Sequence, residues 1–407
     1  MLPPFTSASH DGDLGCFVRN IILNSIFQKG QFIIPDIASQ TGFSVTTIAK
    51  YVSELYAEDI LEKGDCLKTN KRGRNPVLYR VKSGTYYFLG VDLKPFELII
   101  GLMNLTGDMV CIERITDFRF ENTHNKLDEI CTHISQFMLK FQSQNAGKIA
   151  GVNFNIGGRV NSHLGTSTTI FNFEETREVP LTLLLNERLG IPVFMAYGEY
   201  VSENNASQEN VIYVNIGWGL GLCIIINGEI YYGKDGYSGE FGHIHMYENN
   251  VMCHCGKKGC IETEISGSAV CRKLVERIYN HEASVLSKKV WNGNMITIED
   301  IIEAAKLEDP LCIELVTQAG GELGHQLAGL INLLNPDRII IGGRMSEIAP
   351  YYFLQPVKLA VHKYSLRLMT QQLSIVPSRL GGDAGVIGAC LIARKKMIWN
   401  KLSIFKR

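Results

Sequence analysis

The stretch 242-GHIHMYENNVMCHCGKKGCIE-262 gathers three cysteines and three histidines in a chain that otherwise spaces these residues widely. Zinc in proteins takes four nitrogen or sulfur ligands at the corners of a tetrahedron. Three thiolates are available here, from Cys253, Cys255 and Cys260. Gly256 and Gly259 allow the backbone to turn tightly enough for the thiolates to converge. The pattern therefore predicts a zinc site.

The spacing alone leaves the fourth ligand open. The candidates are His243, His245 and His254, although the side chain of His254, between two ligating cysteines, would tend to point away. Four protein ligands leave no position for water, so the zinc would be structural and not hydrolytic. One alternative is a turn of reduced cysteines without a metal. A redox pair is disfavoured because C-x-C is not the usual C-x-x-C arrangement.

The chain as a whole has the composition of a globular protein, with 407 residues, 45% of them apolar and 20% charged. A net charge of −1 excludes a bulk attraction to nucleic acid, so any such binding must come from a local patch. No apolar run reaches the length of a membrane span, so no membrane insertion is expected. Residues 1–13 lack the pattern of a secretion signal and are expected to be a disordered lead-in. Eleven mostly isolated cysteines fit reduced thiols in the cytoplasm.

Residues 14–82 predict a winged helix-turn-helix domain. A short helix over 36–40 meets a turn at Thr41-Gly42, and a second helix begins near Ser44, a natural N-cap. We expect an apolar stripe to face inward, formed by Val45, Ile48, Val52, Leu55 and Tyr56. We expect a polar face to point outward, formed by Thr46, Thr47, Lys50 and Ser53. This polar face is free to enter a major groove, and its candidate DNA contacts are Ser44, Thr46, Thr47 and Lys50.

The segment 66–81 predicts the wing, two strands joined by a basic loop that contains glycine. It has no acidic residue and five basic ones, Lys68, Lys71, Arg72, Arg74 and Arg80. Arg72 and Arg74 are the candidate contacts to phosphates or the minor groove. The alternative is that the small helices and the hairpin form a protein-interaction or dimerisation domain.

From residue 86 onward the pattern changes to alternating strands and helices. The order of three strands, a helix, a strand and a helix occurs twice. This repetition predicts an α/β fold with two similar lobes and a cleft between them. A cleft between lobes is the usual place for a small ligand.

The sequences GYSGEFGHIHM (236–246) and CHCGKKGCIET (253–263) resemble the signature of the ROK family of repressors, open reading frames and sugar kinases. Supporting motifs are GVDL at Gly90, IGWGLG at Ile216, NPDRIIIGG at Asn335 and GGDAGVIGAC at Gly381. With the winged helix-turn-helix in front, the chain is similar to ROK transcriptional repressors of the xylose-regulator and N-acetylglucosamine-regulator type. The wing sequence KRGRNP also resembles theirs.

The resemblance implies an actin-like, ribonuclease H-like ATPase-type fold. Lobe 1 would comprise residues 83–197 plus 385–407, and lobe 2 residues 198–384 with the zinc site. The family pattern selects the histidine ten residues before the first cysteine, so the implied ligands are His243, Cys253, Cys255 and Cys260. It also implies sugar contacts from Glu240, His243 and Glu262. The alternative is that both glutamates are solvated or only support the metal ligands.

The residues of a ROK kinase active site are not in place, so we expect no enzyme activity and no catalytic residue. The family's Asn-Asp pair, whose aspartate is the general base, falls on Tyr197 and Gly198. Glu199 is one position away, and its side chain should point elsewhere. Lys94-Pro95-Phe96-Glu97 replaces the Gly-Gly-Thr loop that binds phosphate. Trp218 stands where a small hydroxyl residue is usual, and tight packing explains Gly342 and Gly343 without ATP.

These observations predict a DNA-binding repressor of carbohydrate-utilisation genes with a catalytically dead ROK domain. Its expected partners are a double-stranded DNA operator and an effector that is a sugar, a sugar derivative or a protein. We expect a homodimer or homotetramer, because two DNA-binding units must match half-sites about one helical turn apart. One alternative is a ROK-type sugar kinase with a fused DNA-binding domain. Another is an interaction scaffold whose sugar pocket has decayed.

Overall fold

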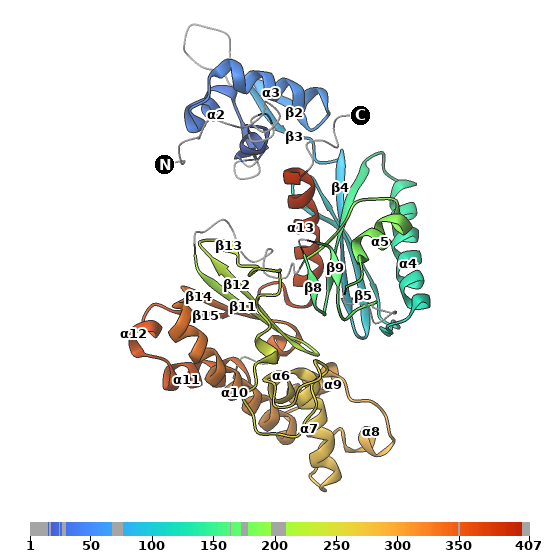
Figure 1. Cartoon of the computed structure of the whole chain (residues 1–407), viewed down its shortest axis with the longest axis vertical. Helices are drawn as coiled ribbons and strands as arrows, with labels where there is room; N and C mark the ends of the chain where they lie inside the picture. Colours follow the sequence, from blue (N-terminus) through green and yellow to red (C-terminus); the bar gives the residue numbers. More distant parts are fainter. Residues whose placement is uncertain are drawn as a thin grey trace.

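The computed structural model describes residues 15, 18–23, 25–26, 30–66, 76–162, 164–171, 178–196, 209–348 and 351–400. Figure 1 shows three parts in succession: an N-terminal domain, a first lobe with the helix α13 beside its sheet, and a second lobe that carries most of the helices. None of the described helices combines the length and the hydropathy needed to cross a membrane.

The N-terminal domain is a winged helix-turn-helix. Helical residues 18–23 and 25–26 precede β1 (Gln31–Phe32), α2 (Ile34–Thr41), α3 (Val45–Ala57), β2 (Leu61–Cys66) and β3 (Val77–Val81). The strands form an antiparallel sheet in the order β1-β3-β2. Gly42 ends α2 with a positive φ of 74°, and its N–H donates to Ala38 O. The first strand of the wing begins at Leu61, earlier than the expected segment from residue 66.

The apolar stripe of α3 is narrower than the sequence predicts. Ile48, Val52 and Leu55 are buried, as expected. Val45 is 53% exposed and Tyr56 is 43% exposed, so the prediction that they face inward is wrong. Val45 is the first residue of the helix and lies outside the stripe, while the Tyr56 ring lies 4.7 Å from Lys63 Nζ on the wing. A stripe of this width leaves more of α3 at the surface.

Lobe 1 is built on a five-stranded sheet in the order β10-β7-β4-β5-β6. Its strands are β4 (Tyr86–Lys94), β5 (Glu97–Asn104), β6 (Met109–Ile115), β7 (Lys148–Ile156) and β10 (Val193–Met195). The helices α4 (His124–Gln142) and α5 (Leu181–Leu189) pack on one face, and α13 (Ala384–Asn400) lies against the other (Figure 1). A short hairpin of β8 (Val160–Asn161) and β9 (Thr166–Ser167) follows β7.

Close packing of α13 on this sheet depends on a glycine in the strand below it. A Cβ atom at Gly90 would lie 2.4 Å from Val386 O and 2.6 Å from Cys390 N. Any larger side chain would push the helix away from the sheet.

Lobe 2 repeats the same topology with the order β13-β12-β11-β14-β15. Its strands are β11 (Val211–Ile216), β12 (Leu220–Ile226), β13 (Glu229–Ile230), β14 (Arg338–Gly342) and β15 (Ser374–Pro377). In both sheets the first three strands form an antiparallel meander, and the last two are parallel to the first strand on its other side. The prediction of two similar α/β lobes is therefore confirmed.

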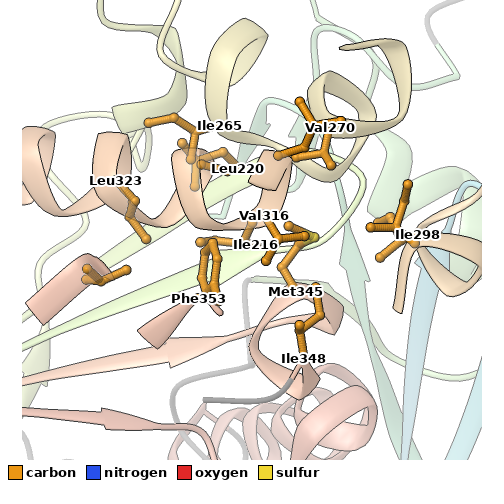
Figure 2. Packing of buried hydrophobic residues seen from close by; sticks show 14 of the residues in the cluster. Ile216, Leu220, Ile265, Val270, Ile298, Val316, Leu323, Met345, Ile348 and Phe353 are labelled. Carbon is orange, nitrogen blue, oxygen red and sulfur yellow. The ribbon is translucent and has the colours of Figure 1, made fainter. Parts of the chain in front are cut away.

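The helices of lobe 2 enclose the largest apolar core. They are α6 (Glu262–Ile265), α7 (Gly267–Tyr279), α8 (Ser287–Trp291), α9 (Ile298–Lys306), α10 (Pro310–Leu334), α11 (Leu354–Tyr364) and α12 (Arg367–Thr370). Three short 3-10 helices add to them, η1 (Phe241–His243), η2 (Arg344–Glu347) and η3 (Gly381–Asp383). Figure 2 shows side chains from the sheet, from α10 and from η2 meeting in this core. The segment from residue 271 to 300 contributes Ile298 and other buried residues to this core.

The N-terminal domain and lobe 1 share a hydrophobic cluster. It joins buried residues of the helix-turn-helix, such as Ile48 and Leu55, to Phe88 of β4 and Leu105 after β5. Met397 and Ile398, near the end of α13, belong to the same cluster. The connection over residues 82–85 is short and is hydrogen-bonded to both parts. Lys82 N donates to Ile60 O of the N-terminal domain, and Thr85 O accepts from Lys148 N of lobe 1. The two parts are therefore packed together and not merely tethered.

Candidate functional site

The loop between η1 and α6 brings the cysteine and histidine side chains together. Two isolated bridges, His245 with Cys260 and Met252 with Lys258, fold the loop back on itself. Gly256 and Gly259 both have positive φ, at 84° and 73°. A Cβ atom at Gly259 would lie 2.2 Å from Tyr247 O, so this turn requires glycine. The two glycines thus do what the sequence analysis expects of them.

Four potential ligand atoms lie within 4.8 Å of one another, from His243, Cys253, Cys255 and Cys260. His243 Nδ1 is 3.5 Å from Cys253 Sγ, and Cys255 Sγ is 3.5 Å from Cys260 Sγ. Zinc bonds of about 2.3 Å to sulfur and 2.1 Å to nitrogen place neighbouring ligand atoms about 3.6–3.8 Å apart in a tetrahedron. The residues present fit a zinc ion.

The other two histidines are less suited to this position. The side chain of His254 is 69% exposed, and its Nδ1 lies 2.9 Å from Glu262 Oε1 and 3.9 Å from Cys253 Sγ. His245 is exposed and is not among the four clustered groups. A second cluster of His243, His254 and Glu262 shares its histidine with the first, so the two cannot be independent sites.

Burial sets the ionisation of these groups in the absence of a cation. Cys253 and Cys260 are 3% and 0% exposed, and burial raises the pKa of Cys253 to about 12. Burial also lowers the pKa of His243, so its imidazole is neutral near pH 7 and can offer a lone pair to a metal. Burial likewise raises the pKa of Cys260, so Cys253 and Cys260 need a bound cation before they ionise at neutral pH.

The expected sugar contacts differ in accessibility. The Glu240 side chain is 36% exposed, with Oε2 3.6 Å from His243 Nε2. The Glu262 side chain is 10% exposed and accepts a hydrogen bond of 2.9 Å from Leu220 N, besides its contact with His254. Glu240 and the outer nitrogen of His243 are therefore available to a ligand, whereas Glu262 is engaged within the protein.

Arg159, which the sequence analysis missed, faces the same group from lobe 1. Its Nε lies 3.9 Å from Glu240 Oε2. It follows the paired glycines at the end of β7, and such glycines next to a strand were the signal that could have drawn attention to it. The contact places a cation of lobe 1 opposite the carboxylate of lobe 2.

A pocket beside this contact is lined by residues of both lobes. Ile156, Ser162 and Met195 lie on lobe 1, and Tyr232 and Ser238 lie on lobe 2. Its lining is mostly apolar, and Ser238 is two residues before Glu240. The pocket agrees with the expectation of a cleft between the lobes.

The residues that replace the phosphate loops meet at another contact between the lobes. Lys94 Nζ lies 3.4 Å from Asp92 Oδ2 and donates a hydrogen bond of 3.0 Å to Gly382 O. The Phe96 and Trp218 rings meet edge to face at 5.1 Å. Tyr197, Gly198 and Glu199 lie outside the described residues.

The candidate DNA-binding residues lie at the start of α3. Ser44 is the N-cap, as predicted, and its Oγ accepts a hydrogen bond from Thr47 N. Ser44 Oγ also lies 2.7 Å from Thr46 Oγ1 and 2.8 Å from Thr47 Oγ1. Thr46 and Lys50 are exposed, and Thr47 is half-buried. Arg72 and Arg74 lie outside the described residues.

Comparison with known proteins finds relatives over most of the chain. The model of the ROK family matches residues 88–396. The DNA-binding transcriptional repressor Mlc of Escherichia coli is 23% identical, with 90% of both chains covered. A glucokinase of Halalkalibacterium halodurans is 28% identical, covering 76% of this chain and 96% of its own.

A solved ROK family transcriptional regulator, a homolog of the Escherichia coli Mlc protein, has a similar structure. Its TM-score is 0.79 at 26% identity, with 96% of this chain and 98% of that chain covered. Because 96% of this chain is covered, the similarity includes the N-terminal domain as well as both lobes. The family match over most of the chain, together with the two lobes of equal topology, shows that this chain belongs to the ROK family.

Proposed function

We propose that this ROK protein is a DNA-binding transcriptional regulator of the repressor type, whose two lobes sense a carbohydrate effector. The observation that carries the proposal is the helix-turn-helix with an exposed polar face at the start of α3. The repressor relative aligns over 90% of the chain, whereas the glucokinase relative aligns over 76%. The additional part that the repressor covers is close in size to the N-terminal domain. A domain shared with a repressor and not needed in a glucokinase supports a role in regulation.

The proposed DNA contacts are Ser44, Thr46, Thr47 and Lys50 on α3, with Arg72 and Arg74 on the wing. Ser44, Thr46 and Lys50 are exposed, and Lys50 adds a positive charge. A helix that enters the major groove uses its first turns for base contacts, and cations contact phosphates. Two such units must be held together, so we propose a homodimer or homotetramer.

Selection of genomic fragments on the purified protein tests the DNA-binding proposal and identifies the operator. Lys50→Ala should then weaken operator binding roughly 5- to 150-fold, the range of one base or phosphate contact. Lys306→Ala, which removes an exposed lysine from lobe 2, is the matched control and should bind as the wild type. Failure to enrich any fragment would contradict the proposal.

The metal centre is proposed to be a structural zinc site held by His243 Nδ1 and the thiolates of Cys253, Cys255 and Cys260. When bound, the zinc would keep the thiolates ionised and fix the loop. His243 would then present its Nε2 to the cleft beside Glu240. These two groups suit the hydroxyls of a sugar, because a carboxylate accepts hydrogen bonds and imidazole can donate or accept one.

A thermal-shift screen against monosaccharides and amino sugars tests the effector proposal. A sugar that binds should raise Tm, and Glu240→Gln should reduce this shift. Glu229→Gln is the matched control, because the Glu229 side chain is 79% exposed and lies on the short strand β13. No shift with any sugar, alongside intact operator binding, would favour a protein effector instead.

A kinase is the second candidate, because the glucokinase relative is 28% identical. We propose that the chain is not an enzyme. Lys94 and Phe96 fill the side of the cleft where a nucleotide would lie, and Lys94 is paired with the buried Asp92. A coupled assay with ATP and glucose should show no turnover above that of protein-free buffer. Sustained turnover by the wild type would establish the kinase alternative.

The proposed DNA partner places the protein in the cytoplasm with the genome. Nine cysteines in the part of the chain that the structure describes lie outside any disulfide. Reduced cysteines are typical of that compartment.

A further inference from the structure

An aromatic pair joins the tips of two turns that belong to different lobes. Phe96 lies in the turn between β4 and β5 of lobe 1, and Trp218 in the turn between β11 and β12 of lobe 2. Their ring centroids are 5.1 Å apart with an interplanar angle of 88°. This edge-to-face arrangement is the favoured geometry for aromatic side chains. The two lobes are therefore in direct contact at these two turns.

Trp218 is held in place by packing and by backbone hydrogen bonds within lobe 2. Its side chain packs against the main core of lobe 2. The start of α7 is bonded to the same turn, because Gly267 N donates to Gly217 O and Ser268 N donates to Trp218 O, at 2.9 and 3.1 Å. The Trp218 ring is thus attached to lobe 2 and not to a free loop.

A second contact starts two residues before Phe96. Lys94 Nζ donates to Gly382 O in η3, the segment through which the chain leaves lobe 2 and enters α13. The neighbouring Asp383 forms an ion pair with Arg114 of β6. The segment between the lobes is therefore tied to lobe 1 at two successive residues.

The charge of Lys94 also has a structural partner. Asp92 is 2% exposed, and burial raises the pKa of its carboxyl group. Asn155 Nδ2 donates to Asp92 Oδ1 at 2.8 Å, and Lys94 Nζ lies 3.4 Å from Oδ2. A buried carboxylate is costly without a cation nearby. The ammonium of Lys94 supplies that cation from within the chain.

We propose that these contacts form an interlobe latch, defined as Lys94 with Gly382 O and Phe96 with Trp218. The latch holds the lobes together without a nucleotide. Relative motion of the two lobes is then limited at these two contacts. The proposal concerns the lobes alone, so it stands or falls independently of DNA binding.

The experiment measures the distance between the lobes in the full chain. Fluorescent labels on unnatural amino acids at Leu139 of lobe 1 and Leu307 of lobe 2, which are 67% and 72% exposed, report this distance by single-molecule energy transfer. The labelled wild type should give one narrow distribution. Trp218→Ala should raise the population with separated lobes roughly two- to thirteen-fold, the range expected for loss of one edge-to-face pair.

The chain offers a matched control. Tyr279 and Trp291 form a similar edge-to-face pair, 5.0 Å apart at 86°, and both lie in lobe 2. Trp291→Ala removes the same kind of contact and should leave the distance distribution unchanged. Phe96→Ala should act like Trp218→Ala, and the double variant should add little to either, since one contact is lost in all three.

Two results would contradict the proposed latch. A wild type with broadly separated lobes would overturn the latch. So would a Trp218→Ala protein with normal circular dichroism and the distribution of the wild type. If Trp218→Ala fails to fold, Phe96→Ala gives the same test, because Phe96 lies at the tip of a turn outside the hydrophobic cores. Lys94→Met should broaden the distribution further when it is combined with Phe96→Ala.

Discussion

Replacing one cysteine of the proposed zinc site has consequences that follow from the geometry of the site. Cys255→Ser removes the thiolate that lies 3.5 Å from Cys260 Sγ and leaves three ligand groups. A serine hydroxyl is a poor ligand for zinc, so the variant should lose the metal on dialysis against a chelator. Wild-type protein treated in the same way should retain about one zinc per chain.

Loss of the ion should also lower the stability of lobe 2. A ligand present at one hundred times its Kd stabilises the folded state by about 2.7 kcal/mol. In a domain of 150–250 residues, each kcal/mol shifts Tm by roughly 2–4 °C, so Tm should fall by about 5–11 °C. The apo site would hold buried neutral thiols, because burial raises the pKa of Cys253 to about 12.

Metal content by mass spectrometry and Tm by differential scanning calorimetry check this prediction. Cys111→Ser is the control, since Cys111 is an exposed residue of β6, outside the four clustered groups. It should keep the zinc content and the Tm of the wild type. The reasoning would be refuted by a Cys255→Ser protein that keeps both, or by wild-type protein that contains no metal when it is purified without chelators.

Three further predictions concern packing and capping. Asp309→Ala should cost about 2 kcal/mol in thermal unfolding, because its carboxylate caps α10 and accepts from two backbone N–H groups. Burial raises the pKa of this carboxyl group, but the N–H donors outweigh burial and hold the pKa below its usual value. The contribution is therefore present at neutral pH and is lost in acid, as the pH falls through the lowered pKa. Gly90→Ala should destabilise by about 1–3 kcal/mol, while Gly221→Ala, which has open space, should not. Met397→Ala should cost about 2–5 kcal/mol and speed hydrogen exchange in α3, unlike the exposed Lys395→Ala.

Local patterns in the sequence predicted the fold well. The strand and helix order gave two lobes, and the structure has two sheets of equal strand order. Ser44 was recognised as an N-cap because the capping rule involves only neighbouring residues. The same local reasoning failed at the ends of α3, where Val45 and Tyr56 are exposed. Periodicity identifies the buried stripe but not how far the neighbouring elements cover it.

Contacts between distant residues were beyond such reasoning. The three cysteines could be grouped by spacing, but the choice among the histidines needed the family resemblance. The structure adds the reason why His254 is unsuited, which is its contact with Glu262. The partners Arg159 with Glu240, and Lys94 with Gly382, are 81 and 288 positions apart. The lobes bring these residues together only after they have folded.

The cluster shared by the N-terminal domain and lobe 1 has a consequence for the entropy of binding an operator. A domain on a flexible linker samples many orientations, and fixing one orientation on binding costs conformational entropy. Here Phe88, Leu105 and Met397 belong to the same core as the helix-turn-helix, so its orientation is fixed before DNA arrives. An assembly of such chains would accept only half-sites at a fixed spacing. Inserting a few base pairs between half-sites should therefore abolish cooperative binding, since the DNA-binding domains cannot reorient on lobe 1 to follow the longer spacing.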